Sequence, residues 1–169
     1  MTPEAIGLIK ASHAQATATP RQLADGFYEH LFAAEPSLRR LFPHDLTLLE
    51  GHFEAALALV VRNLDEMSAL RESLRDLGAQ HVHWGARPED YVTAREALIA
   101  AIGGLVPSWD ATLERHWRGA VTAIIVPMLE GAAVHTAMAA EGLASERVSP
   151  CDEGVSGPPG KRSPATRRW

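Results

Sequence analysis

One stretch of the chain carries an apolar stripe with helical spacing. Its members are separated by four, three, four and three residues: Leu70, Leu74, Leu77, His81 and Trp84. Residues at such intervals lie on one face of an α-helix. The pattern is followed by Gly85 and then by Pro88, and a helix does not continue through this combination. We therefore predict a helix from about Met67 to Trp84 with a histidine on its inward face.

The same periodicity recurs along most of the chain, and nothing in it predicts strands. There is no sustained alternation of polar and β-branched residues and no hairpin dipeptide between such runs. The chain is therefore expected to be all-α, with about seven helices. The remaining predicted helices cover residues 3–16, 20–35, 37–42, 45 or 47 to about 61, 89–105 and 108–137.

Several helix starts are indicated by capping residues. Thr2 precedes the first helix, and Thr19 followed by Pro20 predicts the start of the second, because a hydroxyl can cap a helix whose first position is proline. Ser108 is expected to cap the last helix. Pro127 lies inside that helix, where it removes one backbone hydrogen bond and favours a bend.

Length and composition indicate one soluble globular domain. The chain has 169 residues, of which 46% are hydrophobic and 22% charged, and this is ordinary for a globular protein. A net charge of −5 argues against general affinity for nucleic acid or anionic membrane. The single cysteine, Cys151, excludes an internal disulfide and a zinc site built from thiolates. No continuous apolar run reaches membrane-spanning length, and Met1–Lys10 does not resemble a signal peptide, so a cytoplasmic protein is expected.

The composition changes near residue 141. Serine, proline, glycine and arginine dominate from there to the end, and apolar residues become scarce. Such a segment cannot bury enough apolar surface to fold. We predict a folded domain over residues 1–140 and a disordered tail over residues 141–169.

His81 has two interpretations on the local pattern alone. A histidine on a core-facing stripe is most often a core residue bonded to a backbone carbonyl. Alternatively, it is a ligand to a buried metal ion. His83 lies two residues further on and therefore points to another side of the helix, so only one of the two histidines can serve as an inward ligand.

Two motifs favour the ligand interpretation, because together they resemble bacterial single-domain globins and the globin domain of flavohaemoglobins. Residues 27–32, Phe-Tyr-Glu-His-Leu-Phe, followed by Pro36 and by Leu-Phe-Pro at 41–43, are similar to the second helix and the following corner of these proteins. Residues 77–85, followed by Tyr91, are similar to their proximal segment. The resemblance covers roughly residues 2–129 and leaves the tail without a counterpart.

The resemblance implies a globin fold, haem b as cofactor and His81 as the ligand on the proximal side of the iron. The other ring nitrogen of His81 is then expected to donate to a nearby backbone carbonyl, which fixes the tautomer. Leu77 and Trp84, on the same stripe, are expected to contact the haem. His83 is expected to be a surface residue.

On the distal side, the resemblance implies roles for two aromatic residues. Phe42 is similar to the corner phenylalanine that packs against the haem, although it also suits plain core packing. Tyr28 is expected to donate a hydrogen bond from its hydroxyl to bound dioxygen, where a partly negative acceptor makes the bond worth about 1–3 kcal/mol. The alternative for Tyr28 is a core tyrosine bonded to backbone.

The distal position on the next helix depends on the register. Counted back from Asn63, the position that commonly holds glutamine or histidine falls on Leu49, which leaves the sixth coordination position of the iron open. Phe53 then caps the pocket and His52 reaches towards a propionate. Counted forward from Phe42 with a longer corner, the distal position falls on His52 instead, and a second iron–histidine bond becomes possible. We prefer Leu49.

On the proximal side, Tyr91 is similar to the tyrosine that joins a glutamate in polarising the proximal histidine of flavohaemoglobins. The position of that glutamate falls near Ala132, and Glu130 lies on another face of a regular helix. The carboxylate half of this pair is therefore expected to be absent.

These residues imply a haem protein that binds dioxygen reversibly, with a role in oxygen transport, and that also binds NO and CO. Conversion of NO to nitrate is the most plausible enzymatic activity. Because no glycine-rich nucleotide motif is found, it is expected to require an external reductase. A gas or redox sensor, or an interaction module, is the alternative from another class of protein, and a haemless globin used for protein binding ranks below both.

Overall fold

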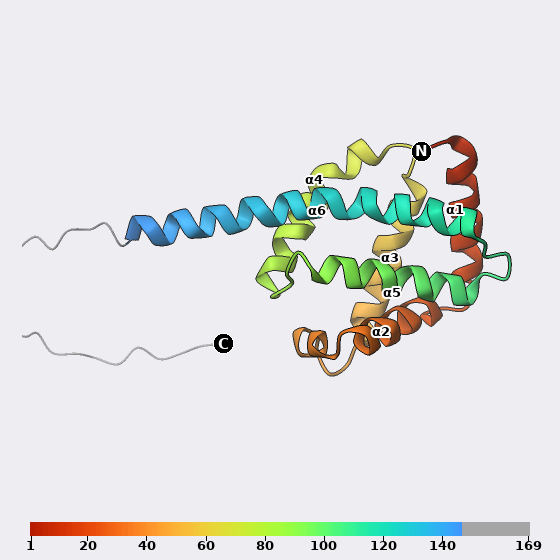
Figure 1. Cartoon of the computed structure of the whole chain (residues 1–169), viewed down its shortest axis with the longest axis horizontal. Coiled ribbons are helices and arrows are strands. Elements are labelled where there is room, and N and C mark those ends of the chain that lie inside the picture. The colour runs from red at the N-terminus through yellow and green to blue at the C-terminus, as the bar shows by residue number, and fades with distance from the viewer. Residues whose placement is uncertain (147–169) are drawn as a thin grey trace, which may run out of the picture.

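The structure is a computed structural model that describes the backbone of residues 1–146 and the side chains of residues 1–140. This part of the chain consists of seven helices and contains no strand (Figure 1). The helices are α1 (Pro3–Ala16), α2 (Gln22–Ala34), the 3₁₀ helix η1 (Pro36–Leu41), α3 (Thr47–Arg62), α4 (Met67–His83), α5 (Asp90–Leu105) and α6 (Ala111–Glu146). The all-α prediction with about seven helices is confirmed.

Most predicted helix boundaries agree with the structure to within two residues, but two predicted caps are wrong. The second helix begins at Gln22, after Arg21 in the left-handed region at φ 69°, and Thr19 does not cap it. Its first turn is instead bonded by Glu54 of α3, whose carboxylate accepts from the backbone N–H groups of Arg21 (3.2 Å) and Ala24 (3.4 Å). Such a cap from a distant helix leaves no local sequence signal.

The last helix differs from the prediction at both ends. The side chain of Asp110, and not of Ser108, accepts hydrogen bonds from the N–H groups of Thr112 and Leu113 at 2.9 and 2.8 Å. The helix then runs to Glu146, which is beyond both the predicted end near Ala137 and the predicted start of the tail at residue 141. The predicted disorder of residues 147–169 lies outside the described residues.

The helices pack in pairs. α2 packs along α5, α4 packs along α6, and α5 and α6 contact each other, while α1 contacts α3, α5 and α6. One apolar core joins these helices, and Trp117 of α6 is its largest fully buried side chain. The indole N–H of Trp117 donates to Ser12 of α1 at 2.9 Å, so this buried polar group is satisfied.

α6 is also long and apolar enough over Ala111–Ala140 to cross a membrane, judged by length and composition alone. The sequence analysis considered only uninterrupted apolar runs, whereas this criterion averages hydropathy over a window that tolerates polar residues. A core helix meets the same criterion, and α6 buries Trp117, Val121 and Met128 in the interior of the domain.

The crossing of α4 and α6 is made by two glycines, one in each helix. A Cβ atom on Gly78 of α4 would lie 1.9 Å from the carbonyl oxygen of Met128, and a Cβ on Gly131 of α6 would lie 2.0 Å from that of Arg75. No side chain fits between the two backbones at these points. The helix that carries His81 is therefore held directly against the backbone of α6.

Candidate functional site

His81 lies in the last turn of α4, and the end of this helix fixes its position. The backbone N–H of Gly85 donates to the carbonyl of Val82, and that of Ala86 donates to His81, both at 2.9 Å. Gly85 adopts φ 94°, a left-handed conformation that residues with a Cβ rarely take. Glycine at this position closes the helix and turns the chain towards α5.

The imidazole of His81 is partly buried and has a defined hydrogen bond. Its Nδ1 lies 2.8 Å from the carbonyl oxygen of Leu77, one turn earlier in α4. Because a carbonyl can only accept, Nδ1 carries the proton and Nε2 keeps its lone pair. Burial lowers the pKa of His81 below its usual value, and the bond to Leu77 offsets part of this effect. The expected bond from the second ring nitrogen to a backbone carbonyl is thus confirmed.

His83 is exposed, as expected for a surface residue. Among the described side chains, those of residues 1–140, no three of histidine, cysteine, aspartate or glutamate come together at a point where they could hold a metal ion. An ion bound by His81 would therefore take its other ligands from a group that is not part of the protein. A neutral imidazole with a free Nε2 would be able to hold the metal ion of such a group.

Two further predicted residues lie beside His81. The ring centroid of Trp84 is 5.1 Å from that of His81, and the ring centroid of Tyr91 is 6.0 Å from it. Trp84 is 53% exposed, so it covers the outer side of the imidazole, whereas Tyr91 is buried. Leu77, Trp84 and Tyr91 therefore lie next to His81, and the contact of Leu77 and Trp84 with a haem stays a prediction.

The Tyr91 hydroxyl is buried and has no hydrogen-bond partner among the described residues. Burial and the nearby Asp90 raise its pKa. The glutamate that the resemblance implies is missing: Ala132 is a buried alanine, and both carboxylate oxygens of Glu130 lie 2.7 Å from the Arg71 guanidinium. In the structure, as in the sequence, Tyr91 has no carboxylate partner. A polar atom left unsatisfied in the interior is consistent with a site that a bound group completes.

The distal residues gather in an aromatic cluster that contains every phenylalanine of the chain. Tyr28 occupies its centre. The ring centroids of Phe27, Phe42, Phe32 and Phe53 lie 5.1, 5.6, 5.9 and 6.0 Å from that of Tyr28. Two helices, α2 and α3, and the corner after η1 thereby meet at one tyrosine, and the predicted distal residues Tyr28, Phe42 and Phe53 are brought together.

Tyr28 is only 5% exposed. Burial, and to a smaller extent the negative charge of Glu50, raise the pKa of Tyr28 to about 12. The hydroxyl is neutral at physiological pH and can act as a hydrogen-bond donor.

The structure places the two candidates for the distal position of α3 differently. Leu49 is partly buried and packs against the core, whereas His52 is exposed. This placement favours the register in which Leu49 faces inward. Phe53 stacks on Phe27 with ring centroids 4.5 Å apart and planes 9° from parallel.

Two residues of this region were missed by sequence reasoning. Phe32 lies one turn after Tyr28 and stacks on it, and the spacing of four residues in α2 could have indicated this contact. Glu50 is 8% exposed and forms an ion pair with Arg21, so a charged group lies buried close to Tyr28. Nothing in the local sequence indicates that ion pair.

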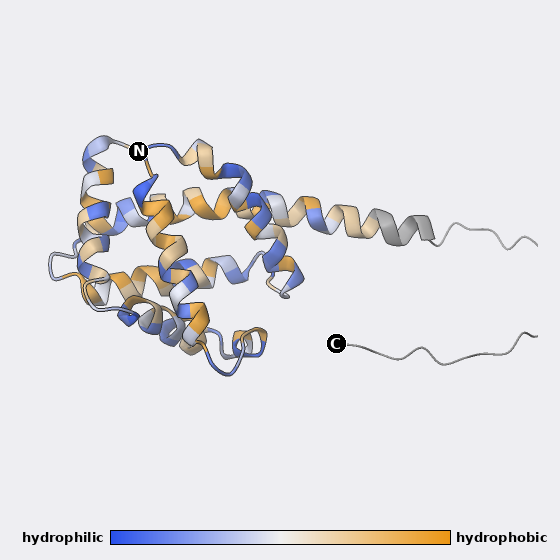
Figure 2. Ribbon diagram, turned by 180° about the vertical axis from the view of Figure 1, so that it is seen from behind, coloured by the Kyte–Doolittle hydropathy of each residue, from blue (hydrophilic) through white to orange (hydrophobic). Residues whose placement is uncertain are grey.

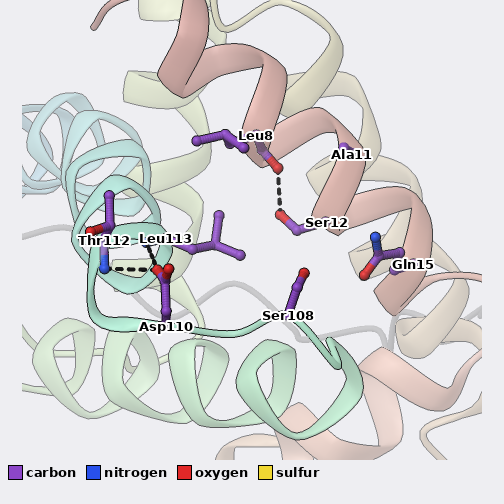
Figure 3. Close-up of a pocket in the computed structure, with 8 residues that line it drawn as sticks. All are labelled: Leu8, Ala11, Ser12, Gln15, Ser108, Asp110, Thr112 and Leu113. Atoms are coloured by element: carbon purple, nitrogen blue, oxygen red, sulfur yellow. Dashed lines mark hydrogen bonds between the residues drawn. The ribbon is translucent and has the colours of Figure 1, made fainter.

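The two groups of residues belong to helices that are held apart. α3 packs on α1 and α2, whereas α4 packs on α6, and the two helices do not pack closely on each other. A separate shallow pocket of about 360 Å³ lies between α1 and the start of α6 and is lined in part by Ser12, Asp110 and Leu113 (Figure 3). None of the predicted site residues lines this pocket.

This order of helices, with a half-buried histidine at the end of α4 and an aromatic cluster between α2 and α3, defines a globin fold. Residues 25–128 match the family model described as Globin, and the chain belongs to the globin family. Membership in this family implies that the protein binds haem and, at the haem, gaseous ligands such as dioxygen.

Individual relatives agree with this assignment. A flavohemoprotein of Vibrio cholerae is 25% identical over 125 residues, which is 71% of this chain and 32% of the relative. The chain therefore spans about a third of that protein. A Pseudomonas aeruginosa protein described as structurally highly homologous to a human hemoglobin has a TM-score of 0.67 and 27% identity over 75% of this chain and 97% of its own. A bacterial globin of Campylobacter jejuni shares the fold, with a TM-score of 0.69 at 20% identity over 78% of this chain and 96% of its own.

Proposed function

We propose that the protein is a haem b globin that binds dioxygen reversibly, that takes NO and CO at the same position, and that converts NO to nitrate with an electron from an external reductase. Haem iron, when bound, supplies the ligand-binding position and the one-electron chemistry. The observation that carries the proposal is the hydrogen bond between His81 and Leu77, which leaves Nε2 of a neutral, half-buried imidazole available to the iron.

The proximal residues hold and orient that ligand. The Leu77 carbonyl fixes the tautomer and the plane of the ring, and Trp84 and Tyr91 restrict its movement. Because no carboxylate contacts Tyr91, the imidazole lacks the anionic partner that would make it strongly electron-donating. The proximal side is therefore suited to ligand binding better than to cleavage of an O–O bond.

The distal residues select and retain the diatomic ligand. Tyr28 donates a hydrogen bond to dioxygen in the pocket, and Phe42 and Phe53 exclude water around it. Leu49, which can neither donate nor ligate, leaves the position open, so that Tyr28 is the principal donor. His52 is exposed on α3 and would hold a propionate of the haem.

The reaction with NO balances as one NO, one dioxygen and one electron giving one nitrate ion. The electron comes from a flavoprotein or iron–sulfur reductase, which is the external partner of the proposal. The apolar cluster around Tyr28 supports this role, because it limits the entry of water and protons that would release dioxygen as superoxide.

Two measurements test the proposal. The visible absorption spectrum of the purified protein is expected to show a Soret band, and its ferrous form a five-coordinate spectrum if Leu49 faces the ligand. Rapid mixing of the ferrous protein, equilibrated with dioxygen, with NO is expected to yield stoichiometric nitrate. A protein that folds but does not take up hemin contradicts the first part, and slow or absent nitrate formation contradicts the second.

A gas sensor or interaction module is the second candidate, and one observation favours it. The helix of His81 is joined backbone to backbone with α6, and α6 continues past the body of the domain (Figure 1). Displacement of α4 on ligand binding would therefore reach the surface through α6. Hydrogen exchange of residues 133–140 with and without CO tests this role, and unchanged exchange speaks against it.

A further inference from the structure

One stretch of α6, residues 133–140, lies outside the body of the domain and contains no charged residue. After passing α4, it continues outward (Figure 1). Every residue from 133 to 140 is exposed. Between Glu130 and Glu141 the chain contains no aspartate, glutamate, lysine or arginine. A helical segment that is fully exposed to water normally carries charged residues on its outer face, and residues 133–140 carry none.

Large apolar side chains lie on this projecting segment. Val134 is 47% exposed and Met138 is 67% exposed, and their spacing of four residues places them on the same side of α6. The segment is coloured mostly as hydrophobic in Figure 2. Contiguous exposed apolar groups of this kind mark interaction surfaces.

A groove lies beside these side chains, where α6 leaves α4. It has a volume of about 200 Å³, and Val134 and Met138 form part of its wall. Its lining also includes the small residues Ala79 of α4 and Gly131 of α6. Three charged residues of α4 complete it: Asp76 and the ion pair of Glu72 with Arg75. His135, on the same stretch of α6, also lines it. The patch thus combines projecting apolar side chains with a hollow of small residues.

We propose that this surface binds a second copy of the same chain, in a two-fold dimer in which the ends of the two α6 helices pack antiparallel. A two-fold interface uses the same patch on both subunits, so projections and hollow must occur together, as they do here. Met138 and Val134 of one copy occupy the hollow beside Gly131 of the other. His135 then lies near Asp76 of the other copy, to which a ring N–H can donate, while Glu72 is paired with Arg75 of its own helix.

The chemistry of the segment favours a second copy over a lipid surface. From Gly119 to Ala140 there is no lysine or arginine to contact lipid headgroups. The first half of α6 is committed to the core of the domain through the buried Trp117 and Val121. The exposed half is rich in alanine, which allows helices to approach closely. These features fit a helix–helix contact in water.

Sedimentation equilibrium of the full-length, haem-loaded protein tests the proposal, with reductant present so that Cys151 cannot form disulfides. A dimer is expected. The double substitution Val134→Glu and Met138→Glu is expected to raise its dissociation constant by at least about 100-fold, because each change enters the interface twice and buries a charge in apolar surroundings. The control is Leu59→Glu, which changes an exposed apolar residue of α3 (45% exposed) and is expected to leave the dissociation constant unchanged.

The Soret absorbance and the helical circular dichroism of each variant establish that it is folded, and the milder pair Val134→Ser and Met138→Ser replaces the glutamates if it is not. A wild-type protein that stays monomeric to millimolar concentration overturns the proposal. So does a dimer that Val134→Glu and Met138→Glu leave intact. Binding of a monomeric wild type, but not of the double variant, to phosphatidylcholine or phosphatidylglycerol vesicles also overturns it and assigns the surface to a membrane.

Discussion

Gly78 of α4 lies against the backbone of Met128 in α6, so closely that a Cβ at Gly78 would stand 1.9 Å from the Met128 carbonyl oxygen. Gly78 is also one turn away from His81, the candidate iron ligand. The packing of two helices and the placement of the haem ligand therefore depend on the same short segment of α4.

The first prediction follows from this contact. Gly78→Ala is expected to lower the free energy of unfolding by about 1–3 kcal/mol, because a methyl group cannot be accommodated without separating α4 from α6. Urea denaturation measures the change. Gly119→Ala is the matched control in α6: nothing lies within 4 Å of a Cβ there, and alanine favours the helix, so its stability is expected to be equal or higher. Equal effects of the two substitutions would show that the crossing is loose.

Loss of the candidate iron ligand is expected to abolish haem retention. His81→Ala removes the Nε2 donor, and the ratio of Soret to protein absorbance after gel filtration is expected to fall to near zero at equal expression. His83→Ala removes an exposed imidazole of the same helix end and is expected to keep a wild-type ratio. If His81→Ala retained haem and had normal ferrous spectra, a residue other than His81 would be the iron ligand.

The distal tyrosine is expected to control ligand escape. Tyr28→Phe removes only the hydroxyl and leaves the aromatic contacts in place, so that dioxygen is expected to dissociate roughly tenfold faster if the hydrogen bond is worth about 1.4 kcal/mol. Stopped-flow replacement of dioxygen by CO gives this rate. CO acquires less negative charge than dioxygen, so its own dissociation should change much less. Identical dioxygen rates in the two proteins would mean that the Tyr28 hydroxyl does not reach the ligand.

A fourth prediction concerns pH and a histidine far from the haem site. Nε2 of His13 in α1 is buried and has no partner among the described residues, and burial lowers the pKa of His13 below 6.5 despite the opposing charge of Glu54. The unfolded chain therefore binds a proton at higher pH than the folded one. The contribution of neutral His13 to the free energy of unfolding is fully present above about pH 6.5, and it is lost as the pH falls through the lowered pKa of the folded state.

Urea denaturation at pH 7.5 and 5.5 measures this decline. His13→Gln keeps a polar side chain but cannot titrate, so the difference in stability between the two pH values is expected to be smaller in this variant. His30→Gln, at an exposed position of α2, is the control and is expected to retain the wild-type difference. A His13→Gln protein with an undiminished difference would assign the pH dependence to other groups.

The helices, and the side of α4 on which His81 lies, could be predicted from the sequence because both depend on local spacing. Apolar residues three and four positions apart give a helix and its buried face, and Gly85 and Pro88 mark the end of α4. The pairing of Tyr28 with Phe42 and Phe53 was predicted in another way, through the resemblance to bacterial globins, since contacts between separate helices have no local signal.

The tertiary structure alone decided the features that depend on two distant segments. The first turn of α2 is bonded by Glu54, 33 residues after Arg21, so no local rule could place the start of that helix at Gln22. The packing of α4 on α6 brings Arg71 to Glu130, and the packing of α3 on α1 and α2 turns Leu49 towards the core and His52 towards solvent. Helix propensity depends on neighbouring residues. The cap from Glu54, the ion pairs between helices and the backbone contacts between helices form only when residues far apart in the chain meet.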